Sequence, residues 1–350
     1  MALGKGYAAR AAIGKETSWG SAVTVGQMLP FTSESIEKAI TKLASEYLDG
    51  SPARRGLTNS AISVQGDLSG EVIFDTTGGT MTFEQLIYAA VMNAGTRDAT
   101  NGLNKYTPAT GDGVQHTIAF EKDVSVWEIP GAKVNTLEIS GEADSKIVFT
   151  AGIIGKTLLR TGDTGIVNNT AAFDAISYTD PTVLTFKDAV FRIGDQVDAL
   201  AAGDQVTIDQ FTFTINNNLT DPQFASEDAS HTDADLTLEP VRNGFREVTL
   251  KIRIPRYTSD QLFTWDKNGT ALQADLKFTV GSYQFNLLIP HLQINESPKA
   301  SVGGVEVYPI EVSFQLFKNN SNSFMTFQDG TAITYEFGIE VKSDRTTPAS

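Results

Sequence analysis

The chain has 350 residues, and its 27 Lys and Arg against 42 Asp and Glu give a formal net charge of −15. This balance argues against a protein that grips the nucleic-acid backbone, which needs a basic surface, but not against one that DNA merely passes. The absence of cysteine excludes disulfides, thiolate nucleophiles and cysteine-ligated metal sites. With no long apolar run and no signal-peptide-like start, we expect a protein made in a reducing cytoplasm that does not enter a membrane.

Apolar and polar residues alternate along most of the chain, in short segments between clusters of Gly, Asn, Asp and Pro. A period of two predicts antiparallel β-structure with one buried face. The clearest such segments are 61–74, 117–129, 205–215, 247–254, 283–289 and 305–317. Aromatic residues at alternate positions of these segments are predicted to lie in the core. The sequence therefore predicts an all-β-dominated fold with minor helix.

Helical patterning is scarce. The segment 81–94 predicts a helix that Thr82 caps and Gly95 ends. A shorter helix is predicted over 259–267, before an Asn-Gly pair. The segment 33–43, which follows a strand-like start, also fits a helix.

Long polar loops at 48–60 and 216–243 interrupt the strands. Loops beyond about 12–15 residues are usually functional or disordered. The chain is predicted to divide into four parts: an N-terminal arm (1–27), a first domain (28–165), a linker or insertion (166–203) and a second domain (204–345).

Segments of the first half recur in the second half in the same order, which predicts a duplicated domain. The pairs are GAKVNTLEIS (131–140) with GVEVYPIEVS (304–313), TFEQL (82–86) with TSDQL (258–262), and the strand into 31–32 with the strand into 211–212. The spacing of about 175 residues is the size of a domain and far above that of stacked repeats. Chance similarity between two alternating β-rich halves is the alternative.

Apparent motifs for catalysis and binding are incomplete. The segment 152–157 imitates the end of a P-loop, but Thr150 stands where that motif needs Gly, so a strand with a glycine bulge or turn is favoured. The three histidines lie in no zinc-binding spacing. The acidic residues of 227–235 offer oxygen ligands for Ca²⁺, yet they match no EF-hand, so a solvated loop is favoured. We expect no enzyme activity, no cofactor and no metal.

The segments KETSWGSAV (15–23) and LPFTSESI (29–36) resemble the N-terminal signature of tail tube proteins (major tail proteins) of long-tailed bacteriophages. The run GDLSG (66–70), the helix predicted after it and the segment 304–317 are similar to the same family. The resemblance covers most of residues 15–317 and points to the two-domain type.

This resemblance implies a fold and an assembly. Each domain is expected to be a β-sandwich flanked by one helix, and the strands are expected to pool into a barrel within a ring. A chain with two copies is expected to form homotrimeric rings with pseudo-sixfold symmetry. The rings stack into a tube, and DNA passes through its lumen without specific binding.

The resemblance also implies partners and a location. The expected partners are the tape measure protein, the tail terminator and the distal tail or baseplate proteins. The protein is expected in the virion tail after synthesis in the host bacterial cytoplasm. The family has no catalytic residues to carry over. The alternatives are another virion structural protein, namely a tail terminator, a distal tail protein or a decoration protein, and an adhesin or carbohydrate-binding β-sandwich.

Contacts between rings are expected from the two long loops and the N-terminal arm, since loops of this kind contact the neighbouring ring in the family. The candidate contact residues are Trp19, Arg54, Arg55, Glu227, Asp228, Asp233 and Asp235. Because stacking is head-to-tail, Arg54 and Arg55 are expected to meet acidic side chains of the adjacent ring.

Overall fold

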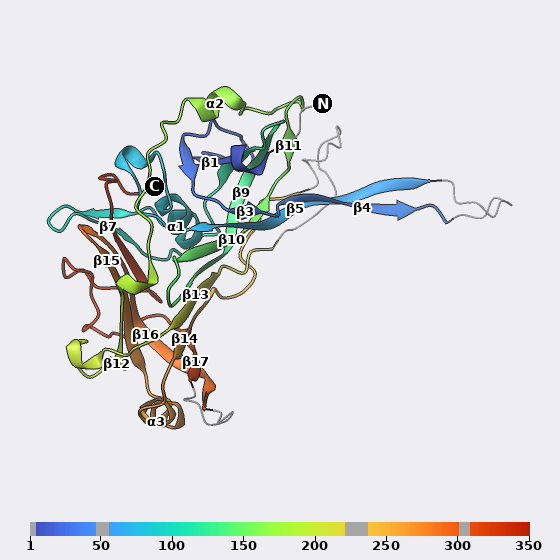
Figure 1. Cartoon of the computed structure of the whole chain (residues 1–350). Coiled ribbons are helices and arrows are strands. Elements are labelled where there is room, and N and C mark those ends of the chain that lie inside the picture. The colour runs from blue at the N-terminus through green and yellow to red at the C-terminus, as the bar shows by residue number, and fades with distance from the viewer. Residues whose placement is uncertain (1–4, 47–55, 221–236, 301–308) are drawn as a thin grey trace.

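The computed structural model of the chain describes residues 5–46, 56–220, 237–300 and 309–350 (Figure 1). These residues form eighteen β-strands and three α-helices, so the prediction of a β-dominated fold is confirmed. No helix in these ranges is long and apolar enough to cross a membrane.

The strands of the first half are β1 (Arg10–Lys15), β2 (Gln27–Leu29), β3 (Ser33–Glu34), β4 (Glu37–Ala44), β5 (Leu57–Glu71), β6 (Thr96–Asp98), β7 (Leu103–Tyr106), β8 (His116–Glu121), β9 (Val126–Glu142), β10 (Val148–Gly155) and β11 (Leu159–Arg160). Those of the second half are β12 (Ala189–Asp195), β13 (Gln210–Asn216), β14 (Glu247–Ile254), β15 (Leu272–Val280), β16 (Tyr283–Ala300), β17 (Ile310–Leu316) and β18 (Gly338–Lys342). The helices are α1 (Glu84–Val91), α2 (Thr170–Asp174) and α3 (Gln261–Asn268).

Two series of six antiparallel strands have the same spatial order. In the first half the neighbours run β1, β8, β9, β10, β5, β4. In the second half they run β12, β15, β16, β17, β14, β13. The two orders correspond strand by strand when each series is read along the chain, with α1 and α3 between the third and fourth strands of their series.

Strand β9 joins the two series into one sheet. The part of β9 from 136 to 142 pairs with β10 on one edge and with β13 on the other. The sheet therefore continues from β4 through β9 to β17 without a break (Figure 1). Strand β18 adds a second link between the halves, because it pairs with both β16 and β7.

One hydrophobic core extends through both halves. The predicted alternation of buried and exposed positions holds in β13, where Phe211, Phe213 and Ile215 are buried. Phe278, Phe285 and Phe314 are also buried, so the interpretation of the strand aromatics as core is confirmed. Their burial removes large apolar surfaces from water and favours this packing.

Both predicted helices are present, but the predicted end of the first is wrong. Thr82 caps α1, because its Oγ1 accepts a hydrogen bond from the backbone N–H of Gln85. The helix ends at Met92, whose left-handed φ of 65° stops it before Gly95. Helix α3 ends at Gly269 in the left-handed conformation that glycine favours.

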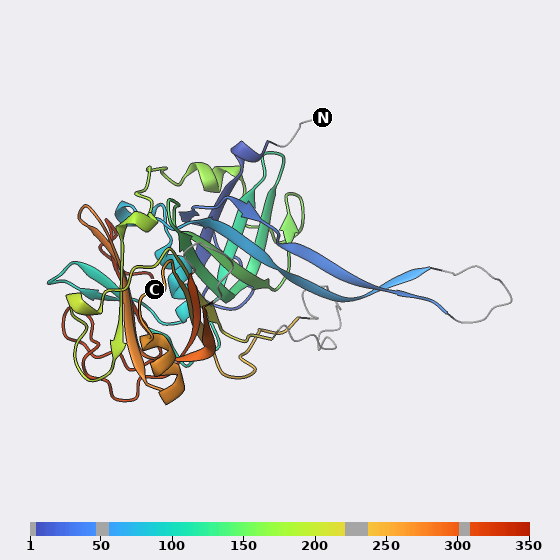
Figure 2. The same ribbon diagram turned by 60° about the horizontal axis from the view of Figure 1, so that its bottom comes forward.

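The segment 33–43 is not a helix. Strand β4 pairs with β5 along its whole length, and together they form a long hairpin that projects from the body of the molecule (Figures 1 and 2). Cross-strand pairing with β5 overrules the helical pattern of this segment. The strand predicted for the P-loop-like segment is confirmed, because residues 152–155 lie in β10. The bulge at this place is in β9, opposite Gly152 and Ile153, and not at a glycine of the segment.

Of the sequence matches that suggested a duplication, one pair lies in equivalent elements of the two halves and another does not. The helices α1 and α3, which carry the TFEQL and TSDQL segments, hold equivalent places. The segment 131–140 lies in β9, whereas 310–313 lie in β17, and these strands hold different places in the two orders. Strand β12, within the range predicted as a linker, pairs with β15 as β1 pairs with β8.

Candidate assembly surfaces and a buried polar clamp

One face of the continuous sheet is polar. The strand registers place small polar residues and charges side by side across six strands, on the side opposite the core. One row across the sheet consists of Ser69, Thr150, Glu138, Thr214, Thr249 and Gln315.

The charges on this polar face are mostly negative. Asp67, Glu138, Glu142, Glu247 and Glu311 stand there with Lys251 and Arg253. Of the two cations, Arg253 is already paired with Asp209 at 2.9 Å. The face therefore presents net negative charge to whatever lies in front of it.

The sheet has an open edge at each end. Among the described residues, β4 pairs with β5 alone. Within the same ranges, the part of β16 from 293 to 300 pairs only with β17, whereas the earlier part also pairs with β15 and β18. Exposed strand edges carry unpaired N–H and C=O groups that recruit further strands.

The β4–β5 hairpin also exposes apolar side chains. Leu43 is 55% exposed and Leu57 is 65% exposed, and they lie on neighbouring strands near the far end of the described hairpin. An apolar projection of this kind is expected to be covered by another molecule.

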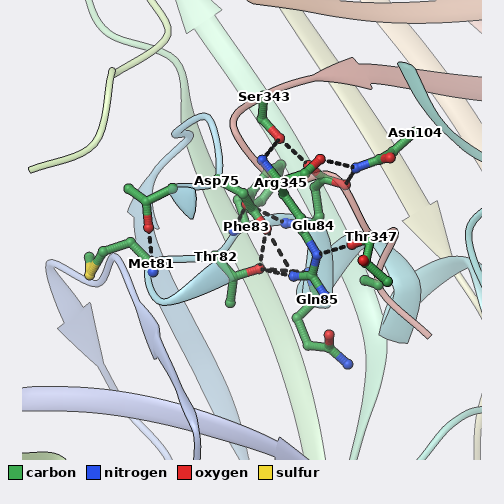
Figure 3. A network of polar contacts seen from close by, with 12 residues as sticks. Asp75, Met81, Thr82, Phe83, Glu84, Gln85, Asn104, Ser343, Arg345 and Thr347 are labelled. Atoms are coloured by element: carbon green, nitrogen blue, oxygen red, sulfur yellow. Dashed lines mark hydrogen bonds and ion pairs between the residues drawn. The ribbon is translucent and has the colours of Figure 1, made fainter. Parts of the chain in front are cut away.

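A buried polar cluster holds the end of the chain against α1 (Figure 3). Asp75 accepts hydrogen bonds from the backbone N–H groups of Phe83 at 2.6 Å and Glu84 at 3.1 Å. It also accepts from the Thr82 hydroxyl at 2.6 Å and forms an ion pair with Arg345 at 3.0 Å. A carboxylate thus serves the start of the helix and the C-terminal segment together.

The second carboxyl of the cluster is Glu84, in the first turn of α1. It accepts hydrogen bonds from Asn104 at 2.7 Å and Ser343 at 2.6 Å, and it is also bonded to the Tyr106 hydroxyl. That hydroxyl in turn accepts from the backbone N–H of Ala349 at 2.9 Å. We call Asp75, Glu84, Tyr106, Ser343 and Arg345 the clamp.

Burial controls the protonation of this region. Burial, together with the nearby Asp75, raises the pKa of Glu84 to about 8. Burial also raises the pKa of Asp75, against the attraction of Arg345. Beside the helix, burial lowers the pKa of His116 to about 4, and its Nε2 lies 3.0 Å from the Gln85 amide. The clamp is therefore one buried ion pair beside a carboxyl whose raised pKa favours its protonated form.

A sequence model of the family described as phage tail tube protein matches residues 6–316. The chain belongs to the phage tail tube protein family. No curated protein matches the chain at a significant level. The family assignment makes it a structural protein of the virion tail that assembles with itself into a tube. The polar face and the open edges are features that such self-assembly can use.

The structure of this tail tube protein places one of the predicted ring-contact residues. Trp19 is half-buried, and its Nε1 donates a hydrogen bond to the Gly131 carbonyl at 3.0 Å. Lys156 lies over its ring at 4.9 Å. These contacts fix the N-terminal segment to β9 within the same chain, and a role for Trp19 between rings stays a prediction.

The other predicted contact residues lie outside the described residues. They are Arg54, Arg55, Glu227, Asp228, Asp233 and Asp235. The clamp and the polar face were not singled out from the sequence. A signal for the clamp exists in the Thr82-x-Glu84 start of α1, but its partner Arg345 is far away in the chain.

Proposed function

We propose that this tail tube protein forms closed rings of three chains, which stack into the hollow tube through which DNA leaves the virion. The observation that supports this best is the repeated strand order together with the β9–β13 join. Each chain then carries two copies of one domain, the second beginning at β12, and three chains give six similar units around the axis.

The join inside the chain suggests how the ring closes. β9 of the first copy pairs with β13, the outer strand of the second copy. The corresponding strands left open are β16 of the second copy and β4 of the first copy. A head-to-tail contact between β16 of one chain and β4 of the next closes when the rotation closes, and a closed barrel has no edges.

The polar face of the sheet lines the channel in this arrangement. DNA carries one negative charge per about 1.7 Å of its axis, and a basic lining would retain it. The excess of carboxylates on the polar face repels DNA and lets it slide. This explains how an acidic protein serves as a conduit without binding a sequence.

The projecting hairpin and the long loop after β13 contact the next ring in this proposal. Arg54 and Arg55 of one ring meet acidic side chains of the adjacent ring. At the two ends of the tube the partners are the tail terminator and the distal tail or baseplate proteins, and the tape measure protein occupies the lumen during assembly.

The test combines negative-stain electron microscopy with native mass spectrometry of the purified full chain. The proposal predicts long hollow fibres and a ring of three chains after mild dissociation. A ring of six chains would contradict the stoichiometry, and a protein that stops at a single ring would indicate a tail terminator. Replacing Arg54 and Arg55 with Glu is expected to shorten the fibres at low salt, since such pairs are screened by salt.

A further inference from the structure

Strands β9 and β16 share a bulge at an asparagine in the same place. In β9 the register passes from Val134 opposite Ile153 to Thr136 opposite Gly152, so Asn135 is the extra residue. In β16 it passes from Ile294 opposite Phe314 to Glu296 opposite Ser313, so Asn295 is the extra residue. The extra residue of a bulge is left out of the ladder of hydrogen bonds, and its side chain points in a new direction.

The bulge in β9 holds the two halves of the chain together. The Asn135 carbonyl accepts a hydrogen bond from the Asn217 N–H at 2.8 Å. The Asn135 side-chain Oδ1 accepts one from the Leu219 N–H, also at 2.8 Å. One bulged asparagine thus receives two backbone donors from the segment that continues β13.

Asn295 occupies the corresponding bulge in β16, but within the described residues no segment lies beside it as the continuation of β13 lies beside Asn135. It is exposed, and its side-chain amide makes no hydrogen bond to any residue in the described ranges. We propose that Asn295 is the docking residue for a second copy of the chain, and that β4 of that copy pairs with β16 as far as Glu296 in the register that β13 has on β9. This inference rests on the proposed ring and specifies its contact.

The register follows from the matching pairings. Lys133 faces Ile154 as Gln293 faces Gln315, which aligns the two bulges. Across the next two strands, Ile154 faces Gln65, which faces Glu37. In the second half, Gln315 faces Thr249, which faces Thr214. Glu37 of β4 therefore corresponds to Thr214 of β13.

This correspondence fixes the residues that meet between chains. Since Asn216 faces Thr136 in the internal join, Ala39 of one chain faces Glu296 of the next. Since Asn217 donates to the Asn135 carbonyl, the N–H group of Ile40 donates to the carbonyl of Asn295. Ala39 and Glu296 are both exposed in the single chain, as such a contact requires.

Disulfide trapping tests the register, because the chain has no cysteine of its own. The hydrogen bond at Asn217 makes the adjacent Asn216–Thr136 pair a non-hydrogen-bonded one, and the Cα atoms of such pairs are about 4.5 Å apart, within disulfide range. The variant Ala39→Cys/Glu296→Cys is assembled under reducing conditions, oxidised and run on a non-reducing gel. We expect covalent species of two and three chains and none larger.

The matched control is Thr41→Cys/Glu296→Cys, which moves one cysteine two residues along the same face of β4. Its cross-linked yield is expected to be at least tenfold lower. Equal yields, or no cross-link in either variant while fibres form, would overturn the inferred register and leave the tube function standing. A protein that forms no rings at all in the electron microscope would contradict the proposed function itself.

Discussion

Helices α1 and α3 occupy the same place in the two strand series, yet their surroundings differ. All eight residues of α1 are buried, whereas Leu262 is the buried residue of α3. Helix α1 contacts β9 and β7 and is covered by the C-terminal segment through the clamp. Helix α3 contacts β16 and leaves its outer face exposed.

This difference shows that one strand order can support two kinds of helix. The first helix is part of the core and is tied to the end of the chain, so its polar groups must be satisfied internally. The second is a surface helix whose polar groups are hydrated. We therefore expect substitutions near α1 to cost far more stability than matched ones near α3.

The largest effect is expected for Arg345→Met. The change leaves the buried Asp75 carboxylate without its cation, and breaking a buried pair in this way costs about 3–5 kcal/mol. The matched change beside α3 is Asp260→Asn, an exposed site where about 0.5 kcal/mol or less is expected. Urea unfolding of the two variants measures the difference, and equal costs would refute the contrast between the helices.

A second contrast concerns the apolar anchors of the helices. Leu86→Ala is expected to lower the free energy of unfolding by about 2–5 kcal/mol, because Leu86 is fully buried and the change leaves a cavity. Leu262→Ala, at the edge of the core, is expected to fall at or below the low end of that range. A cost for Leu262→Ala above that for Leu86→Ala would contradict the account.

Most of the strands could be predicted from the sequence, but the clamp could not. Period-two alternation predicts β5, β13, β14 and β16 because burial of one face depends only on local spacing. The ion pair of Asp75 with Arg345 depends on how distant segments meet, which no local pattern encodes.

Two further features needed the tertiary structure. The end of α1 at Met92 depends on packing, since this side chain is buried with Ile154 and Leu219 in spite of its left-handed backbone. Strand β4 was ambiguous because its identity comes from pairing with β5 rather than from its own pattern.

The pH dependence of stability sharpens the comparison. The pKa of Glu84 is raised from 4.5 to about 8 by burial, so between these values the folded state holds a proton that the unfolded state has lost. The free energy of unfolding therefore falls as pH rises from about 4.5 to about 8, and the loss is complete above that window. No comparable pH dependence of the free energy of unfolding is expected from α3.

Glu84→Gln tests the contribution of Glu84 to this pH dependence, because the amide resembles the protonated carboxyl and does not titrate. Compared with the wild type by urea unfolding at pH 5, 7 and 9, the variant is expected to gain relative stability as pH rises. His116, whose lowered pKa weakens the fold below about pH 6.5, affects both proteins alike. Parallel curves for the two proteins would show that Glu84 is ionised in the folded state.

The smallest expected effect is at the end of α3. Gly269 has a φ of 59°, and Gly269→Ala forces a side chain into the left-handed region at a cost of about 1 kcal/mol. Nothing crowds the added methyl group, so the cost is backbone strain alone. Thermal unfolding checks it, with Gly111→Ala as a control at an open glycine that has no positive φ. Equal melting temperatures for the two variants would contradict the argument.

The central claim is that one chain supplies two equivalent units to a closed ring. Cryo-electron microscopy of the assembled tube, with helical reconstruction, tests it most directly. The account predicts three chains per ring, a continuous barrel in which β4 of one chain pairs with β16 of the next, and the polar face toward the channel. A ring of six whole chains, or a barrel that joins β4 to any other strand, would contradict it.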